Sequence, residues 1–196
     1  MKKCLLYTCF IAFSLTACKK TDQIKSDTQE FDHIKLNYDG RYNLASAVSD
    51  NPVDINLDGN ANKDLLKEIP DFNKSTIIIR VIKDINPVAK KNFAVSFDIS
   101  YPEQYALVNG REISSFNPQA EVIFLNQGFA TPCEIDTLKK SINLLSENNS
   151  NETIRRFTRP NEIKILEDGK IQISIKKEFY TKQGWVMANI TSVYKK

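Results

Sequence analysis

The chain has 196 residues, of which 26% are charged and 41% hydrophobic, and this balance is typical of one globular domain with a tail. It excludes a disordered chain and a multi-span membrane protein. The 27 basic residues barely outnumber the 24 acidic ones, so the charge does not indicate a nucleic-acid-binding protein. The single histidine, His33, leaves little room for histidine-dependent catalysis or zinc binding.

The first 17 residues have the pattern of a secretory signal peptide. A basic start, Lys2-Lys3, is followed by a mostly apolar stretch over residues 5–17, shorter than the about 20 residues that a membrane-spanning helix needs. We therefore exclude residues 1–17 from the fold.

The end of this segment resembles the lipobox of bacterial lipoproteins, because Leu15-Thr16-Ala17 is followed by Cys18. The resemblance implies cleavage before Cys18, a lipid on its sulfur with acyl chains such as palmitate, and anchoring to a membrane of the cell envelope. We expect the outer membrane of a Gram-negative bacterium. More than one acyl chain gives stable anchoring. The alternative is an ordinary signal peptide with a chance cysteine.

Cleavage would leave Cys133 as the only free thiol of the mature chain, so no intrachain disulfide is expected. The mature chain would keep 25 basic and 24 acidic residues, a net charge that predicts no electrostatic attraction to lipid or nucleic acid. Residues 18–38 are polar without a sustained apolar period, and we interpret them as the lipidated N-terminus and a flexible tether. His33, near the end of this tether, is expected to be solvated.

The segment after residue 53 contains half of a calcium-binding pattern. Asp54-Ile55-Asn56-Leu57-Asp58-Gly59 matches the first half of an EF-hand loop, D-x-[DN]-x-[DN]-G. The second half departs from it, since Leu65 occupies the position of the bidentate glutamate. The sequence predicts a weak calcium site, with Glu68 as a further substitute ligand. The alternative is an Asx-rich turn whose side chains cap backbone amides. The predicted ligands are Asp54, Asn56, Asp58, Asn60, Asn62 and Asp64.

Residues 39–196 show recurring strand patterns and no repeat of fixed period. The clearest alternation runs from Phe93 to Tyr101, where apolar residues occupy every second position. The segment 77–82 is a dense β-branched run. Weaker alternations include Tyr42, Leu44 and Val48, then Ala120, Val122 and Phe124, and finally Val186, Ala188, Ile190 and Tyr194.

A hairpin is expected around Asp168-Gly169. A three-residue loop over 167–169 pairs Ile165 with Ile171 and Ile163 with Ile173, which places the isoleucines on one face. Gly169 is then expected in the left-handed region. Lys176-Lys177, beside Phe179 and Tyr180, is explained by a strand with basic residues on its outer face.

One segment favours a helix, from about 132 to 147. Thr131-Pro132-Cys133-Glu134 has the composition of a capping box, and Ile135, Leu138, Ile142 and Leu145 follow at helical spacing. Cys133 would lie in the first turn, where a helix dipole lowers a thiol pKa. A buried small hydrophobic residue is the simpler interpretation, because no second mature cysteine or nearby histidine accompanies it.

Short connections between strands favour an antiparallel meander that closes into a barrel or half-barrel. Gly40-Arg41-Tyr42 at the first strand, the acidic segment 52–59 followed by Asp64-Leu65-Leu66, and the last strand 190–196 resemble the lipocalin-like lipoproteins of Gram-negative bacteria. Lipocalins usually carry tryptophan where this chain has Tyr42. The resemblance covers about residues 38–196 and implies a barrel that holds a small apolar ligand.

No catalytic residues are identified. A catalytic pair would have to use His33, outside the expected domain, and no glycine-rich phosphate loop is present. We therefore expect a non-enzymatic envelope lipoprotein that binds a small apolar ligand or a protein partner. The alternatives are a structural or assembly subunit of an envelope complex without a small ligand, and an envelope hydrolase. A roomy cavity would favour ligand binding, and a filled core with an exposed apolar patch would favour a protein partner.

Overall fold

The computed structural model describes residues 27–83, 91–145 and 159–196. The chain divides into two compact units, one formed by Met1–Asp39 with Val81–Ala94 and the other by Gly40–Arg80 with Val95–Lys196. The second unit contains the sheet described first below, apart from residues 81–83 and 93–94 of two of its strands. The N-terminal residues 1–26, and with them the predicted signal peptide and Cys18, lie outside the described residues.

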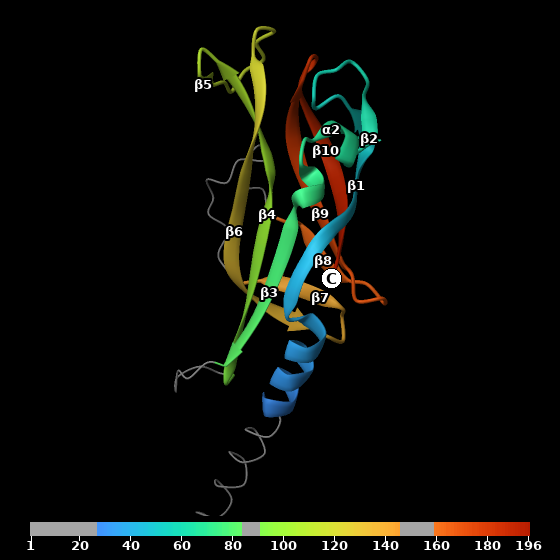
Figure 1. The fold of residues 1–196 in the computed structure, drawn as a ribbon, viewed down its shortest axis with the longest axis vertical. Helices are drawn as coiled ribbons and strands as arrows, with labels where there is room; N and C mark the ends of the chain where they lie inside the picture. Colours follow the sequence, from blue (N-terminus) through green and yellow to red (C-terminus); the bar gives the residue numbers. More distant parts are fainter. Residues whose placement is uncertain (1–26, 84–90, 146–158) are drawn as a thin grey trace, which may run out of the picture. The chain divides into compact units, whose positions relative to one another are not determined.

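The described chain is mainly β-structure (Figure 1). In chain order its elements are β1 (Gly40–Val53), β2 (Asn62–Asp64), α2 (Leu65–Glu68), the 3₁₀ turn η1 (Phe72–Lys74), β3 (Thr76–Lys83), β4 (Phe93–Val108), β5 (Arg111–Glu112), β6 (Glu121–Asp136), β7 (Ser141–Leu144), β8 (Glu162–Ile165), β9 (Ile171–Thr181) and β10 (Gly184–Lys195).

These strands form a closed antiparallel barrel. The strand order is β10-β9-β8-β7-β6-β4-β3-β1, and the antiparallel pairing of β1 with β10 closes it. The short strands β2 and β5 add to β1 and β4. Eight strands suffice to enclose an interior that side chains can fill. The expected antiparallel meander closing into a lipocalin-like barrel is confirmed.

Two sequence patterns translate directly into the barrel core. Along β4, every second residue from Phe93 to Tyr101 is buried, as the alternation predicted. In the β8–β9 hairpin, Ile165 pairs with Ile171 and Ile163 with Ile173, and Gly169 has φ 76°. The predicted three-residue loop is confirmed, and it puts four buried isoleucines on one face.

The expected alternation in β1 fails at Val48, which is 47% exposed. Leu44 pairs with Tyr194 of β10 and Ser46 with Val193, so one extra residue, Ala45, is inserted into β1. This β-bulge shifts the alternation by one residue, because the side-chain period of a strand is two. Ala47 therefore faces the core in place of Val48.

The helix predicted from about 132 to 147 is wrong over its described part. Residues 131–136 belong to β6 and residues 141–144 form β7. Cys133 pairs with Val95 on one side and with Leu144 on the other, and these cross-strand partners outweigh the local capping signal. The apolar residues that were expected on one helix face do not share one environment, because Ile135 is buried whereas Leu138 is exposed. Residues 146 and 147 lie outside the described residues.

The other compact unit contains a helix over residues 27–38, where we expected a flexible tether. Phe31 and Ile34 are buried, and their spacing of three residues places them on one helix face. The ring of Phe31 lies 5.9 Å from that of Phe93, and Lys35 Nζ donates to the carbonyl oxygen of Val81 at 3.2 Å. Packing within this unit thus orders a segment that is polar overall. The remaining tether residues 18–26 lie outside the described residues.

Candidate functional site

The acidic loop after β1 folds around hydrogen bonds from its own backbone. The accepting side-chain oxygens lie two or five residues before the N–H groups that donate to them, as in Asx turns. These pairs are Asp54 Oδ2 with Gly59 N (3.1 Å), Asn56 Oδ1 with Asp58 N (2.9 Å), Asp58 Oδ1 with Asn60 N (2.7 Å), Asn62 Oδ1 with Asp64 N (2.9 Å) and Asp64 Oδ1 with Leu66 N (3.1 Å). This is the geometry of the alternative interpretation.

The predicted calcium ligands are therefore engaged with the loop itself. Asp64 caps the N-terminus of α2, and Asn60 is exposed. Within the described ranges, no three histidine, cysteine or acidic side chains are grouped so that they could hold a metal ion. Calcium binding stays a prediction, and the role of these residues in the structure is to fix the course of the loop.

Glu68 lies beneath this loop and is buried. Its Oε2 accepts a hydrogen bond from Ile55 N at 3.0 Å, which ties the loop to α2. Burial raises the pKa of the Glu68 carboxyl, and the nearby carboxylates of Asp58 and Asp54 act in the same direction. This contact engages one carboxylate oxygen of Glu68, and its role as a substitute calcium ligand stays a prediction.

Inside the barrel, Lys177 of β9 and Glu103 of β4 form a buried ion pair. Lys177 Nζ also lies 5.5 Å from the ring centre of Tyr101 and 5.9 Å from that of Phe179. The expectation that Lys177 faces outward is wrong. The inward position of Lys177 could have been predicted from the sequence. Lys177 lies an even number of residues after Ile171 and Ile173, so the three side chains share the inward-facing side of the strand.

Cys133 and His33, the two residues considered for chemistry, differ in their surroundings. The thiol of Cys133 is buried in β6, and burial raises its pKa to about 12. It is thus a neutral thiol near pH 7, as the simpler interpretation expected. His33 is exposed on the helix over residues 27–38, where its ring Nδ1 lies 3.3 Å from Asn37 Nδ2. The expected solvent exposure of His33 is confirmed.

The barrel interior beside Lys177 is nearly filled. A cavity of about 30 Å³ remains there, which is room for about one or two waters. Its lining is largely apolar and comes from β4, β9, β10 and the α2–η1 segment, including Ile69, Phe72, Ile99, Tyr101, Phe179 and Tyr194. No interior space for a larger ligand is present among the described residues at this position.

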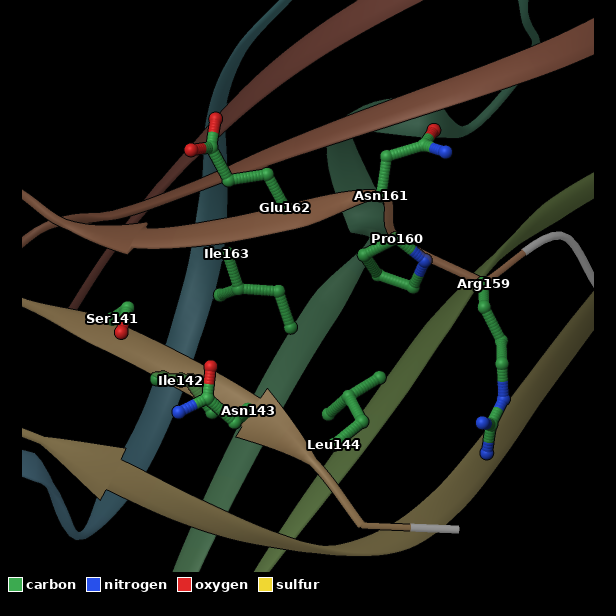
Figure 2. A pocket seen from close by; sticks show the side chains of 9 residues that line it. All are labelled: Ser141, Ile142, Asn143, Leu144, Arg159, Pro160, Asn161, Glu162 and Ile163. Atoms are coloured by element: carbon green, nitrogen blue, oxygen red, sulfur yellow. The ribbon is translucent and has the colours of Figure 1, made fainter. Parts of the chain in front are cut away.

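A larger pocket of about 490 Å³ lies where β7 and β8 separate (Figure 2). These strands are paired through Ser141 and Lys164, and Ile165 N donates to Lys140 O at 2.7 Å. Beyond that point Pro160 cannot donate to a strand partner, and Asn161 N bonds instead to Ser174 O of β9 at 2.8 Å. The two strands diverge, and the pocket opens between them.

The pocket has an apolar floor and a polar rim. Ile142 and Ile163 are both buried core residues, and Figure 2 shows the side chains of Ile163 and Leu144 pointing toward each other across the space. The amide of Asn161 and the carboxylate of Glu162 point away from that space (Figure 2). The further rim residues are Ser141, Asn143 and Arg159. The segment 146–158, which connects the two walls along the chain, lies outside the described residues.

Comparison of the chain with protein-family models, curated proteins and solved structures gives no match. Among the described residues, no helix combines the length and apolar character needed to cross a membrane. The β7–β8 pocket was not predicted from the sequence. It depends on the separation of two strands, one of which lies in a segment that we expected to be helical.

Proposed function

We propose that this chain is a lipid-anchored, non-enzymatic protein of the bacterial cell envelope that binds a small apolar molecule in the pocket between β7 and β8. The lipobox-like residues before Cys18 support the anchor and its acylation, for example with palmitate. The pocket carries the binding proposal. Its volume of about 490 Å³ falls within the range of about 300–1,000 Å³ typical of ligand sites.

The exposed lining of the pocket is more polar than apolar, so it suits a ligand that carries a substantial polar part beside its apolar part. Ile142, Leu144 and Ile163 form the apolar part of the lining, and Ser141, Asn143 and Asn161 contribute polar groups. The small volume of the cavity beside Lys177 supports this location over that part of the barrel interior.

The proposal of a non-enzymatic role rests on the chemistry of the described residues. The Cys133 thiol is buried with a raised pKa, so it is a poor nucleophile. His33 belongs to the compact unit that does not contain the pocket. Glu162 at the pocket rim pairs with Lys164 at 2.8 Å as an exposed ion pair.

Two measurements test this function. Cys18→Ser should abolish labelling by a palmitate analogue, and labelling that persists in this variant would contradict the anchor. A dansyl-labelled fatty acid should bind to the purified protein with a fluorescence increase that Leu144→Asp removes. Leu125→Asp, on exposed β6 surface, is the matched control and should bind as the wild type does. Equal binding by both variants would contradict the pocket.

A structural or assembly role is the second candidate, and the edge of β6 favours it. β6 pairs with β4 over residues 121–133 but with β7 only over 133–136. Within the described ranges, the remaining outer edge of β6 has no strand partner, and residues 122–133 carry no charge. Such an edge accepts an extended segment of another protein. Absence of fatty-acid binding together with loss of a cross-linked envelope complex in Asn126→Pro would support this role instead.

A further inference from the structure

Four chain segments meet at the end of the barrel where β1 begins. They are residues 40–42, the β6–β7 turn with Asp136 (136–140), the β8–β9 turn (166–170) and residues 194–196, and we call them the anchor-side end. Ile165 N bonds to Lys140 O, Ile171 pairs with Tyr194, and Tyr194 pairs with Leu44. The N-terminal segment that follows Cys18 enters the barrel at Gly40, within this end.

The opposite end consists of residues 50–64, 109–121 and 181–184. A Cβ atom on Gly184 would lie 3.8 Å from the Phe116 side chain, and one on Gly59 would lie 3.8 Å from Lys182 Nζ. Tyr180, beside the last of these segments, donates through its hydroxyl to the carbonyl oxygen of Asn117. These contacts place the three segments together.

The two ends carry opposite charge. The anchor-side end has six basic residues, Arg41, Lys139, Lys140, Lys170, Lys195 and Lys196, and three acidic ones, Asp136, Glu167 and Asp168. The opposite end has three basic residues, Lys63, Arg111 and Lys182, and six acidic ones, Asp50, Asp54, Asp58, Asp64, Glu112 and Glu121. The small net charge of the whole chain conceals this asymmetry between the two ends.

An exposed leucine lies at the tip of the anchor-side end. Leu138 is 95% exposed. Its neighbours Lys139 and Lys140 are exposed as well, and they form ion pairs with Asp136 at 3.3 Å and Glu167 at 3.6 Å. Asp136 Oδ1 accepts hydrogen bonds from Leu138 N at 3.1 Å and from Lys139 N at 2.9 Å, so the turn is fixed by its own side chain. A leucine between lysines suits the boundary between headgroups and acyl chains, where the apolar side chain is buried and the ammonium groups stay hydrated.

We infer that the anchor-side end is a membrane-contact surface that binds anionic lipid headgroups, with Leu138 inserted at the interface. The inference rests on the proposed lipidation of Cys18, because the chain continues from the N-terminal segment into the barrel at Gly40 of this end. Basic residues close to an anionic surface attract it within a Debye length. The acidic opposite end would then face away from the bilayer.

Vesicle binding tests the electrostatic part without the anchor. The mature chain carrying Cys18→Ser should sediment with equimolar phosphatidylcholine–phosphatidylglycerol vesicles and not with phosphatidylcholine alone. Lys139→Glu combined with Lys140→Glu should weaken this binding at least about tenfold. The matched control, Lys63→Glu with Lys182→Glu, makes the same charge change at the opposite end and should not weaken it. Equal losses in the two double variants, or equal binding to both vesicle types, would overturn the inference.

Depth measurements on the acylated protein test the orientation. An environment-sensitive NBD probe on Leu138→Cys should shift to shorter wavelength in phosphatidylglycerol-containing vesicles, whereas a probe on Asn60→Cys at the opposite end should not. The buried Cys133 leaves the introduced thiol as the reactive one. If acyl labelling of Cys18 fails, the proposed anchor is wrong. If labelling succeeds and the two probes behave alike, the anchor stands and the membrane-contact surface is wrong.

Discussion

Lys177 on β9 contacts Glu103 on β4 across the interior of the barrel, and both side chains are buried. These strands are not neighbours in the sheet order, so the ion pair joins opposite walls. Burial of two charges costs desolvation energy that their mutual attraction offsets only with good geometry. We therefore assign the ion pair a role in aligning β4 with β9 rather than in raising the net free energy of unfolding.

Removal of one partner is expected to destabilise the protein strongly. Lys177→Met leaves Glu103 as an uncompensated buried charge and should lower the free energy of unfolding by about 3–5 kcal/mol at neutral pH. Lys177→Met combined with Glu103→Leu should recover most of this loss. Urea unfolding measures both. Lys164→Met in the exposed Lys164–Glu162 pair is the control, with an expected loss below about 1 kcal/mol. A double variant as unstable as Lys177→Met would contradict the account.

Glu68 predicts a specific dependence of stability on pH. Its folded pKa is raised above the usual value of 4.5 by burial, so the folded state binds the proton more tightly than the unfolded state. Its stabilising contribution is present below pH 4.5 and is lost as pH rises through the raised pKa. Glu68→Gln keeps an acceptor for Ile55 N and removes the titration. The stability of the wild type minus that of the variant, from urea unfolding, should fall with pH. A constant difference would refute the prediction.

Cys133 should be unreactive in the folded protein. With a pKa of about 12, almost none of the thiol is ionised near neutral pH, and burial blocks access to it. Ellman's reagent should modify Cys133 at the rate of unfolding, whereas the exposed Leu138→Cys should react within the mixing time. Cys133→Ala should cost about 1–2 kcal/mol of stability without loss of ligand binding. Rapid modification of native wild-type protein would show that the site is open.

The correct predictions came from patterns that depend only on the alternation of side chains between the two faces of a strand. Alternation from Phe93 to Tyr101 and the isoleucine register of the β8–β9 hairpin follow from burying one strand face. The Val48 error shows the limit of that reasoning, because one inserted residue at Ala45 reverses the faces and leaves no strong local signal.

The helix predicted after Thr131 failed because a capping signal acts within four residues, whereas the pairing of β6 acts over the whole barrel. Cys133 gains hydrogen-bonded neighbours on both sides only when Val95 and Leu144 arrive from elsewhere in the chain. The β7–β8 pocket was missed for the same reason. By contrast, the inward position of Lys177 was predictable from the period that starts at Ile171.

The acidic loop yields a prediction that separates its two interpretations. Asp58 Oδ1 accepts from Asn60 N, and Asp58 Oδ2 accepts from Asn56 Nδ2 at 3.1 Å. Asp58→Ala removes both contacts and should lower stability by about 0.5–2 kcal/mol, equally in chelator and in calcium. Melting scans in EDTA and in several millimolar calcium measure this. A calcium-dependent rise in the wild-type melting temperature that Asp58→Ala abolishes would instead establish the calcium site.

Gly128 of β6 is required by the close approach of β4. A Cβ atom there would overlap the carbonyl oxygen of Ile99 and would lie 3.3 Å from Ser100 Cα, both of them backbone atoms. Gly128→Ala therefore has to separate the two longest strands of the barrel and should cost about 1–3 kcal/mol.

Gly110 is the control for this variant, because it has φ +72° and open space around the site of a Cβ atom. Gly110→Ala should cost about 1–2 kcal/mol from backbone conformation alone. The two variants should also differ in their effect on amide hydrogen exchange. Gly128→Ala changes the β4–β6 pairing, so amide exchange of residues near Ser100 should accelerate, whereas Gly110→Ala should leave that exchange unchanged apart from global unfolding. Unchanged exchange near Ser100 in Gly128→Ala would show that β4 and β6 tolerate a side chain between them.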